Sequence, residues 1–178
     1  TAPSTVEQAP VGQEGWEVWL CSPWFVGRIE DTAFDRYFEL HAYSCMTKGE
    51  QRDFLGWLEK SGKPVYTFDD LKIPNQVRYP RKEVEASLTA QGFYTSTVAW
   101  MQALAIWEHS QGQLVERINI SGVDMSTDGE YAAQKPGCLH FISVARMVGI
   151  QVEIPVRSEL HKVAPSYPDG HESPFIRE

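Results

Sequence analysis

The sequence lacks most of the features that mark specialised protein classes. Its three cysteines have no CxxC spacing, so neither a disulfide framework nor a zinc site is expected. No apolar run approaches the roughly 20 residues that a membrane-spanning helix needs, and no secretory apolar region opens the chain. The absence of a Walker loop and of G-x-G-x-x-G argues against a P-loop nucleotidase and a nicotinamide-dependent dehydrogenase.

Basic charge is scarce as well. The 16 Lys and Arg residues face 24 Asp and Glu residues, which gives a net charge of −8. The longest basic cluster is the short run Arg78–Lys82, so bulk binding of DNA or RNA is not expected. A small anionic ligand remains compatible with this balance. The few unpaired cysteines favour a reducing, cytoplasmic environment.

What is present is the composition of a globular domain, with 42% hydrophobic residues in 178. A chain of this length buries enough surface for a core without disulfides. We predict one domain over residues 1–162 and an irregular tail over 163–178, where four prolines and glycines interrupt any pattern.

Strand-like and helix-like runs alternate along this domain. Alternating or β-branched runs predict strands at 16–21, 35–41, 64–68, 117–123 and 151–155. Apolar residues at helical spacing predict helices at 48–61, 81–90, 95–110 and 131–149, the last interrupted near Pro136-Gly137, with 69–80 as a connecting loop. This order predicts an α/β, Rossmann-like fold with a mainly parallel sheet flanked by helices.

The opening segment, Thr1–Thr5, is turn-like and no strand precedes it. In a fold of this type such a loop follows a central strand. We therefore expect the first strand of the sheet to be missing from the chain or to lie upstream; an ordinary amino terminus is the alternative.

Ligands of parallel sheets bind beyond the carboxyl ends of the strands. Asp124 follows the expected strand 117–123 and suits a ribose or sugar hydroxyl, or else caps its own loop. The hydroxyl run Thr95, Ser96, Thr97 opens the most apolar helix. Such residues cap a helix, and the same N–H groups also suit a phosphate.

Glu39 and His41 close the strand 35–41 and, two residues apart, point to one face. They are the candidate acid and base groups, and a structural role for His41 stays open. His140, between Leu139 and Phe141 inside a helix, is interpreted as a packing residue. Together with Ser22 and Ser96, His41 and Asp124 are predicted to meet in one crevice.

Several motifs occur in a characteristic order: 94–101, 118–125, Glu130-Tyr131, 140–142, Ile154-Pro155 and 158–160. Over about 90–160 this resembles the Rossmann-like core of bacterial sialyltransferases and motility-accessory-factor glycosyltransferases. The opening Ala2-Pro3-Ser4 is similar to the first nucleotide-binding loop of that group. From residue 1 to about 162 the chain also resembles small tailed-phage proteins of uncharacterised function.

The resemblance implies a crevice for a nucleotide or nucleotide sugar, with no metal site evident. Its ligand-binding residues would be Thr1, Ser4, Ser22, Thr95, Ser96, Thr97, Asp124 and Tyr131. The chain departs from the family at Thr1 and Ser22, where the family has asparagines. Val144 falls near the family's general-base histidine, and valine cannot remove a proton.

Three functions follow as hypotheses. The first is a nucleotide or nucleotide-sugar binder, with or without transferase activity. The second is a structural or morphogenesis protein of a virion that uses the fold for packing. The third is a non-catalytic binder that sequesters a nucleotide signal of host defence. The expected location is the bacterial host cytoplasm, or the virion if the role is structural, and the expected partners are a homo-oligomer or other phage proteins.

Overall fold

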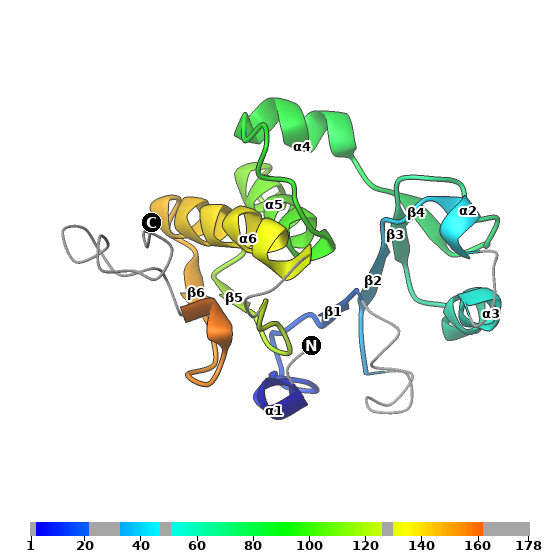
Figure 1. The fold of residues 1–178 in the computed structure, drawn as a ribbon, viewed down its shortest axis with the longest axis horizontal. Coiled ribbons are helices and arrows are strands. Elements are labelled where there is room, and N and C mark those ends of the chain that lie inside the picture. Colours follow the sequence, from blue (N-terminus) through cyan, green and yellow to red (C-terminus); the bar gives the residue numbers. More distant parts are fainter. Residues whose placement is uncertain (1–2, 22–32, 47–50, 126–129, 162–178) are drawn as a thin grey trace, which may run out of the picture.

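The structure, a computed structural model, describes residues 3–21, 33–46, 51–125 and 130–161. These residues form an α/β fold in which parallel strands lie between helices, as the sequence predicted (Figure 1). The strands belong to two separate sheets, one of four strands and one of two. The predicted tail over 163–178 lies outside the described residues.

The larger sheet has the order β1-β2-β3-β4, and every pair in it is parallel. Its register places Tyr37 beside Val65 and Val65 beside Gln76. Its strands are short: β1 (Trp19–Leu20), β2 (Arg36–Glu39), β3 (Val65–Thr67) and β4 (Gln76–Arg78).

The smaller sheet pairs β5 (Arg117–Asn119) with β6 (Gln151–Glu153), again in parallel. The helix α6 (Glu130–Met147) connects them. Parallel neighbours need such a crossover. The other helices are α1 (Pro3–Val6), α2 (Tyr43–Met46), α3 (Gln51–Ser61), α4 (Arg81–Leu88), α5 (Thr97–Ser110) and the 3₁₀ turn η2 (Glu159–His161). Among the described residues, no helix has the length and apolarity to cross a membrane.

Two consecutive residues of β2 show how the larger sheet is covered on both faces. Side chains alternate along a strand, so Tyr37 and Phe38 point to opposite faces, and both are fully buried. Tyr37 packs with Phe54 and Leu58 of α3. Phe38 belongs to the main core, which is formed chiefly by α5 and α6.

The helix α5 has eight buried residues among its 14, in line with its nearly all-round apolar sequence. The Ser96 side chain caps it by accepting a hydrogen bond from the Ala99 N–H at 3.1 Å. Trp100 lies in an aromatic cluster, with its ring centroid 4.0 Å from that of Tyr94 and 5.4 Å from that of Tyr79. The Tyr79 hydroxyl donates to the Trp100 carbonyl at 2.7 Å.

The expected loop 69–80 contains a strand that the sequence analysis missed. β4 occupies Gln76–Arg78, and the Val65 N–H donates to the Asn75 carbonyl at 3.0 Å. The run is only three residues long, has a single apolar side chain and lies between Pro74 and Pro80. Its pairing with β3 is a long-range interaction that local patterns do not reveal.

The expected interruption of the last helix is also wrong, because α6 continues through Pro136. Tertiary packing holds it there. The Thr95 hydroxyl donates to the Gln134 carbonyl at 2.8 Å. Gly137 lies so close to the loop before α5 that a Cβ atom on it would come within 2.1 Å of the Phe93 carbonyl oxygen. His140 stacks on the Phe93 ring at 3.9 Å between centroids, which is the packing role predicted for it.

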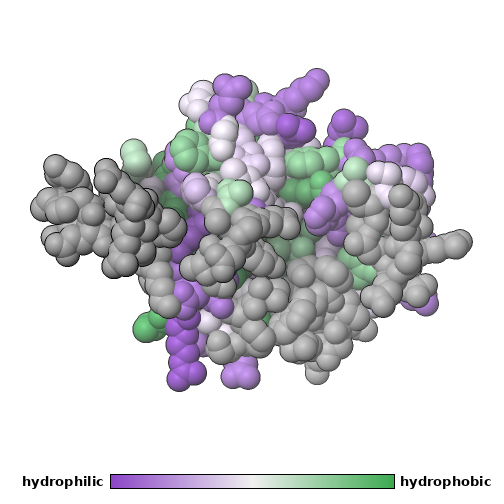
Figure 2. Space-filling model, in the orientation of Figure 1, coloured by the Kyte–Doolittle hydropathy of each residue, from purple (hydrophilic) through white to green (hydrophobic). Residues whose placement is uncertain are grey.

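The surface shows which side of α4 is exposed to solvent. Figure 2 shows hydrophilic side chains over α4, at the upper rim of the molecule, and hydrophobic surface below α4 towards the middle. The sequence of α4 explains this, because Val84 is its buried residue and most of its other side chains are charged or small.

The burial of α5 leads to a direct prediction. Leu104 is 1% exposed in the core and Leu114 is 76% exposed. Leu104→Ala should lower the free energy of unfolding by about 2–5 kcal/mol because it leaves a cavity. Leu114→Ala should change it by less than about 0.5 kcal/mol. Urea denaturation of both variants measures this, and equal effects would contradict the assigned position of α5.

Candidate functional site

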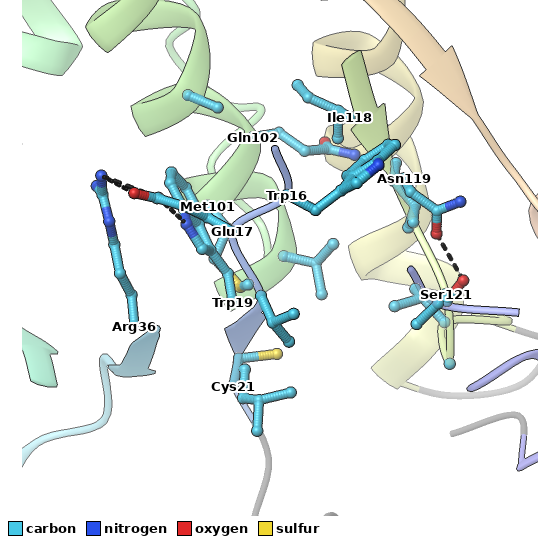
Figure 3. A pocket seen from close by; sticks show the side chains of 18 of the residues that line it. Trp16, Glu17, Trp19, Cys21, Arg36, Met101, Gln102, Ile118, Asn119 and Ser121 are labelled. Atoms are coloured by element: carbon cyan, nitrogen blue, oxygen red, sulfur yellow. Dashed lines mark hydrogen bonds and ion pairs between the residues drawn. The ribbon is translucent and has the colours of Figure 1, made fainter. Parts of the chain in front are cut away.

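A concave feature of the described residues lies between the two sheets. It is a cavity of about 740 Å³ lined by the β1 segment, the β5 segment and one side of α5. Figure 3 shows the chain from Trp16 to Cys21 and the chain from Ile118 to Ser121 running in the same direction on opposite sides of this space. β1 is the edge strand of one sheet and β5 the edge strand of the other.

One end of the cavity lies beyond the carboxyl ends of the strands, and we call it the carboxyl end. It brings together residues from distant segments. His41 follows β2, Ser96 and Thr97 begin α5, and Asp124 follows β5, and all four line the same space. His41, Ser96 and Asp124, three of the four residues predicted to meet in one crevice, thus line the same cavity. The fourth predicted member, Ser22, lies outside the described residues.

Asp124 sits in a loop that its neighbours fix firmly. Its Oδ1 accepts a hydrogen bond from the Glu159 N–H at 3.2 Å, and the Ser158 hydroxyl donates to the Val123 carbonyl at 2.7 Å. Met125, directly after it, has a φ of +48°, a left-handed conformation that few non-glycine residues adopt. Asp124 thus caps the start of η2 instead of its own loop, and it also lines the cavity.

Glu39 and His41 form a close pair. Glu39 is 3% exposed, and its Oε1 lies 2.5 Å from Nδ1 of His41. The same oxygen accepts a hydrogen bond from the backbone N–H of His41 at 3.2 Å. A carboxylate on Nδ1 orients the imidazole and selects the tautomer in which Nε2 is an acceptor. The Glu39 carboxylate therefore fixes the orientation of the imidazole at the wall of the cavity.

Cys21 also lines the cavity but is a poor nucleophile. Burial raises the pKa of its thiol to about 12, with a smaller contribution from the charge of Glu39. The thiolate is the reactive form, so at neutral pH this side chain acts as a small packing group. Burial likewise raises the pKa of Cys138 to about 12, and that residue is fully buried.

The remaining predicted ligand residues are distributed differently. Thr95 donates to α6 rather than lining the cavity. Ser4 lies in α1 and Tyr131 in α6, with side chains outside the described set, and Thr1 lies outside it entirely. Val144, a position singled out by the sequence comparison above, packs against the main core.

An ion-pair cluster beside the cavity was not foreseen. Arg36 of β2 pairs with Glu108 of α5 at 2.6 Å and with Glu17 at 3.1 Å, and its guanidinium lies 4.7 Å from the centre of the Trp19 ring. In the sequence the three charged residues are 19 to 91 positions apart, and none of them belongs to a recognisable motif. Only the alternating pattern of β2, which directs Arg36 and Phe38 to one face, hinted at the arrangement.

Gln102 is the second residue that sequence reasoning missed. It is 4% exposed, it lines the cavity, and neither its Nε2 nor its Oε1 has a hydrogen-bond partner within the described part of the chain. Figure 3 shows it reaching from α5 towards Trp16 and Ile118. An unsatisfied buried amide costs about 1–3 kcal/mol, so Gln102 offers a donor and an acceptor to an occupant of this space.

Comparison with protein-family models, curated proteins and solved structures finds no match to this chain. Within residues 3–21, 33–46, 51–125 and 130–161 no group of three or more His, Cys, Asp or Glu side chains is placed to hold a metal ion. The polar side chains that line the carboxyl end of the cavity include Ser96, Asp124 and His41.

The amide of Gln102 gives a testable stability effect. Gln102→Met keeps the shape of the side chain and removes both orphaned polar atoms, so it should raise the free energy of unfolding by about 1 kcal/mol. Gln91→Met, at an exposed position, is the matched control and should have little effect. A destabilised Gln102→Met variant would show that the amide already has partners.

Proposed function

We propose that this chain binds a small anionic ligand of the nucleotide or nucleotide-sugar class at the carboxyl end of the cavity between β1 and β5. One observation carries the proposal: His41, Ser96 and Asp124, from three separate segments, line a single space there. Ligand crevices of parallel α/β folds lie at this edge.

The topology supports the same place. From β1 the larger sheet grows outward through β2, β3 and β4, and from β5 the smaller sheet grows the opposite way to β6. The space between β1 and β5 is thus a switch point, where connections diverge and leave room above the strand ends.

Each part of such a ligand has a matching group. The first N–H groups of α5, a helix of 14 residues, suit a phosphate. Asp124 suits a sugar hydroxyl, and the imidazole of His41 suits a further hydroxyl. The apolar side chains Leu20, Val98 and Met101 line the wall beside them, where a base or other flat group can pack.

The proposal is one of binding. The side chain near the family's general-base position is Val144, which has no proton-accepting atom, so sialyl transfer is not part of it. The Glu39–His41 pair is the group that would have to serve any reaction at this site.

The test is a thermal-shift screen of the purified chain against nucleotides, nucleotide sugars and cyclic nucleotides. A true ligand at a hundred times its Kd stabilises the folded state by about 2.7 kcal/mol and raises the Tm. If no member of these classes raises the Tm, the proposal is wrong and the structural role leads.

Variants then locate the site. Asp124→Asn keeps an oxygen for the Glu159 N–H but loses the charge, and it should weaken binding of the identified ligand roughly ten- to hundredfold. Asp70→Asn, a change at an exposed carboxylate paired with Lys72, is the control and should leave Kd unchanged. Calorimetric titration gives both values, and equal affinities in the two variants would move the site elsewhere.

A further inference from the structure

The middle of the cavity is bounded by two strand edges. In a strand, successive residues direct their N–H and C=O groups to alternate sides. The backbone groups of Val18 point towards β2: its N–H donates to the Asp35 carboxylate, and its carbonyl accepts from the Arg36 N–H. The backbone groups of Trp19 therefore face the cavity.

The opposite edge has the same character. The Glu116 carbonyl accepts from the Gln151 N–H, and the Ile120 N–H donates to the Glu153 carbonyl, both at 2.9 Å. The backbone groups of Glu116 and Ile120 therefore point towards β6. The backbone groups of Asn119, one position before Ile120, face the cavity. Two rows of strand donors and acceptors thus run in the same direction on either side of one space (Figure 3).

Such edges are templates for another strand, and buried backbone groups need partners. Apolar side chains from β1, α5 and the β5 segment line this space: Leu20, Met101, Ala105, Ile118 and Ile120. Strands buried on both faces of a parallel sheet are apolar along their length. The orphaned amide of Gln102 faces the same space. An occupant with backbone hydrogen-bonding groups and apolar side chains satisfies all three features.

The position of α1 identifies the source of that occupant. The Thr5 hydroxyl accepts a hydrogen bond from the Gly122 N–H at 2.9 Å, a buried contact between α1 and the loop after β5. The start of α1 therefore lies at the carboxyl end of the space. A strand parallel to β1 and β5 would end at this same edge and pass directly into α1, and from there to β1 at its side, the usual neighbour relation of a strand–helix–strand unit.

We propose that the space between β1 and β5 is the seat of one additional parallel β-strand, supplied by polypeptide joined directly to the amino end of α1. This strand unites the two sheets into one continuous parallel sheet. It fills the middle of the cavity and leaves the carboxyl end, with His41 and Asp124, as the crevice above it. The inference goes beyond ligand binding and is independent of any ligand.

Three proteins test it: the 178-residue chain, the chain extended before Thr1 by six valine and isoleucine residues, and a matched extension with proline at its third position. Six residues span about 20 Å, and proline removes a ladder hydrogen bond. Hydrogen exchange is followed at the Trp19 and Asn119 amides, which face the space. The Arg36 and Ile120 amides, already bonded within the sheets, are internal controls.

The strand extension should raise the Tm and slow exchange at Trp19 and Asn119 by at least about tenfold. Exchange at Arg36 and Ile120 should change less, and the proline extension should have a much weaker effect. Equal behaviour of the two extensions would overturn the proposal. So would full protection of Trp19 and Asn119 in the 178-residue chain, a measurement that needs no extension to fold.

The free six-residue peptide, added to the 178-residue chain, separates the sources of the strand. It should protect the same two amides only at high concentration, because a tether supplies an effective concentration in the millimolar range. Protection by the free peptide combined with none in the extended chain would overturn the link to α1 and assign the space to a separate partner.

Discussion

The burial of α5 is the constraint on which the rest of the structure depends. This helix has almost no polar face, so it must be covered on nearly every side. β2, α4 and α6 all pack against it, and side chains of the smaller sheet join the same core. The ion pair between Arg36 and Glu108 adds a polar link from β2 to α5, with both side chains mostly buried. α5 thus holds together two sheets that share no hydrogen-bonded strand pair.

This arrangement concentrates the unusual features of the molecule in one place. The edges of β1 and β5, the unpartnered amide of Gln102 and the first turn of α5 all border the space that α5 spans. The middle of the cavity offers strand edges and apolar side chains that suit another β-strand, and the end near Asp124 offers polar groups that suit a ligand. The two proposals therefore divide one cavity instead of competing for it.

Elements with strong local patterns could be predicted from the sequence. The apolar run from Val98 to Trp107 and the spacing of Phe54 and Leu58 give α5 and α3 directly, and alternation around Tyr37 gives β2. β4 was missed because three residues between prolines carry too little pattern. α6 was divided wrongly because Gly137, which suggests a break, instead allows contact with the Phe93 carbonyl.

The site was only partly predictable for the same reason. Strand ends and helix starts are local features, so His41, Ser96 and Asp124 could be named in advance. The role of Trp19, Arg36 and Gln102 depends on which strands pair and where pairing stops, and that is decided by long-range packing.

The break between the sheets is the central claim, and nuclear Overhauser contacts between backbone protons of the labelled 178-residue protein test it most directly. Adjacent strands lie about 4.8 Å apart, and strands separated by one empty position lie about twice as far. Contacts should appear between Trp19 and Arg36 and between Ile118 and Val152, which are paired in the two sheets. None should join Trp19 to Asn119. Direct backbone contacts between β1 and β5 would contradict the account, because they would leave no space for a strand.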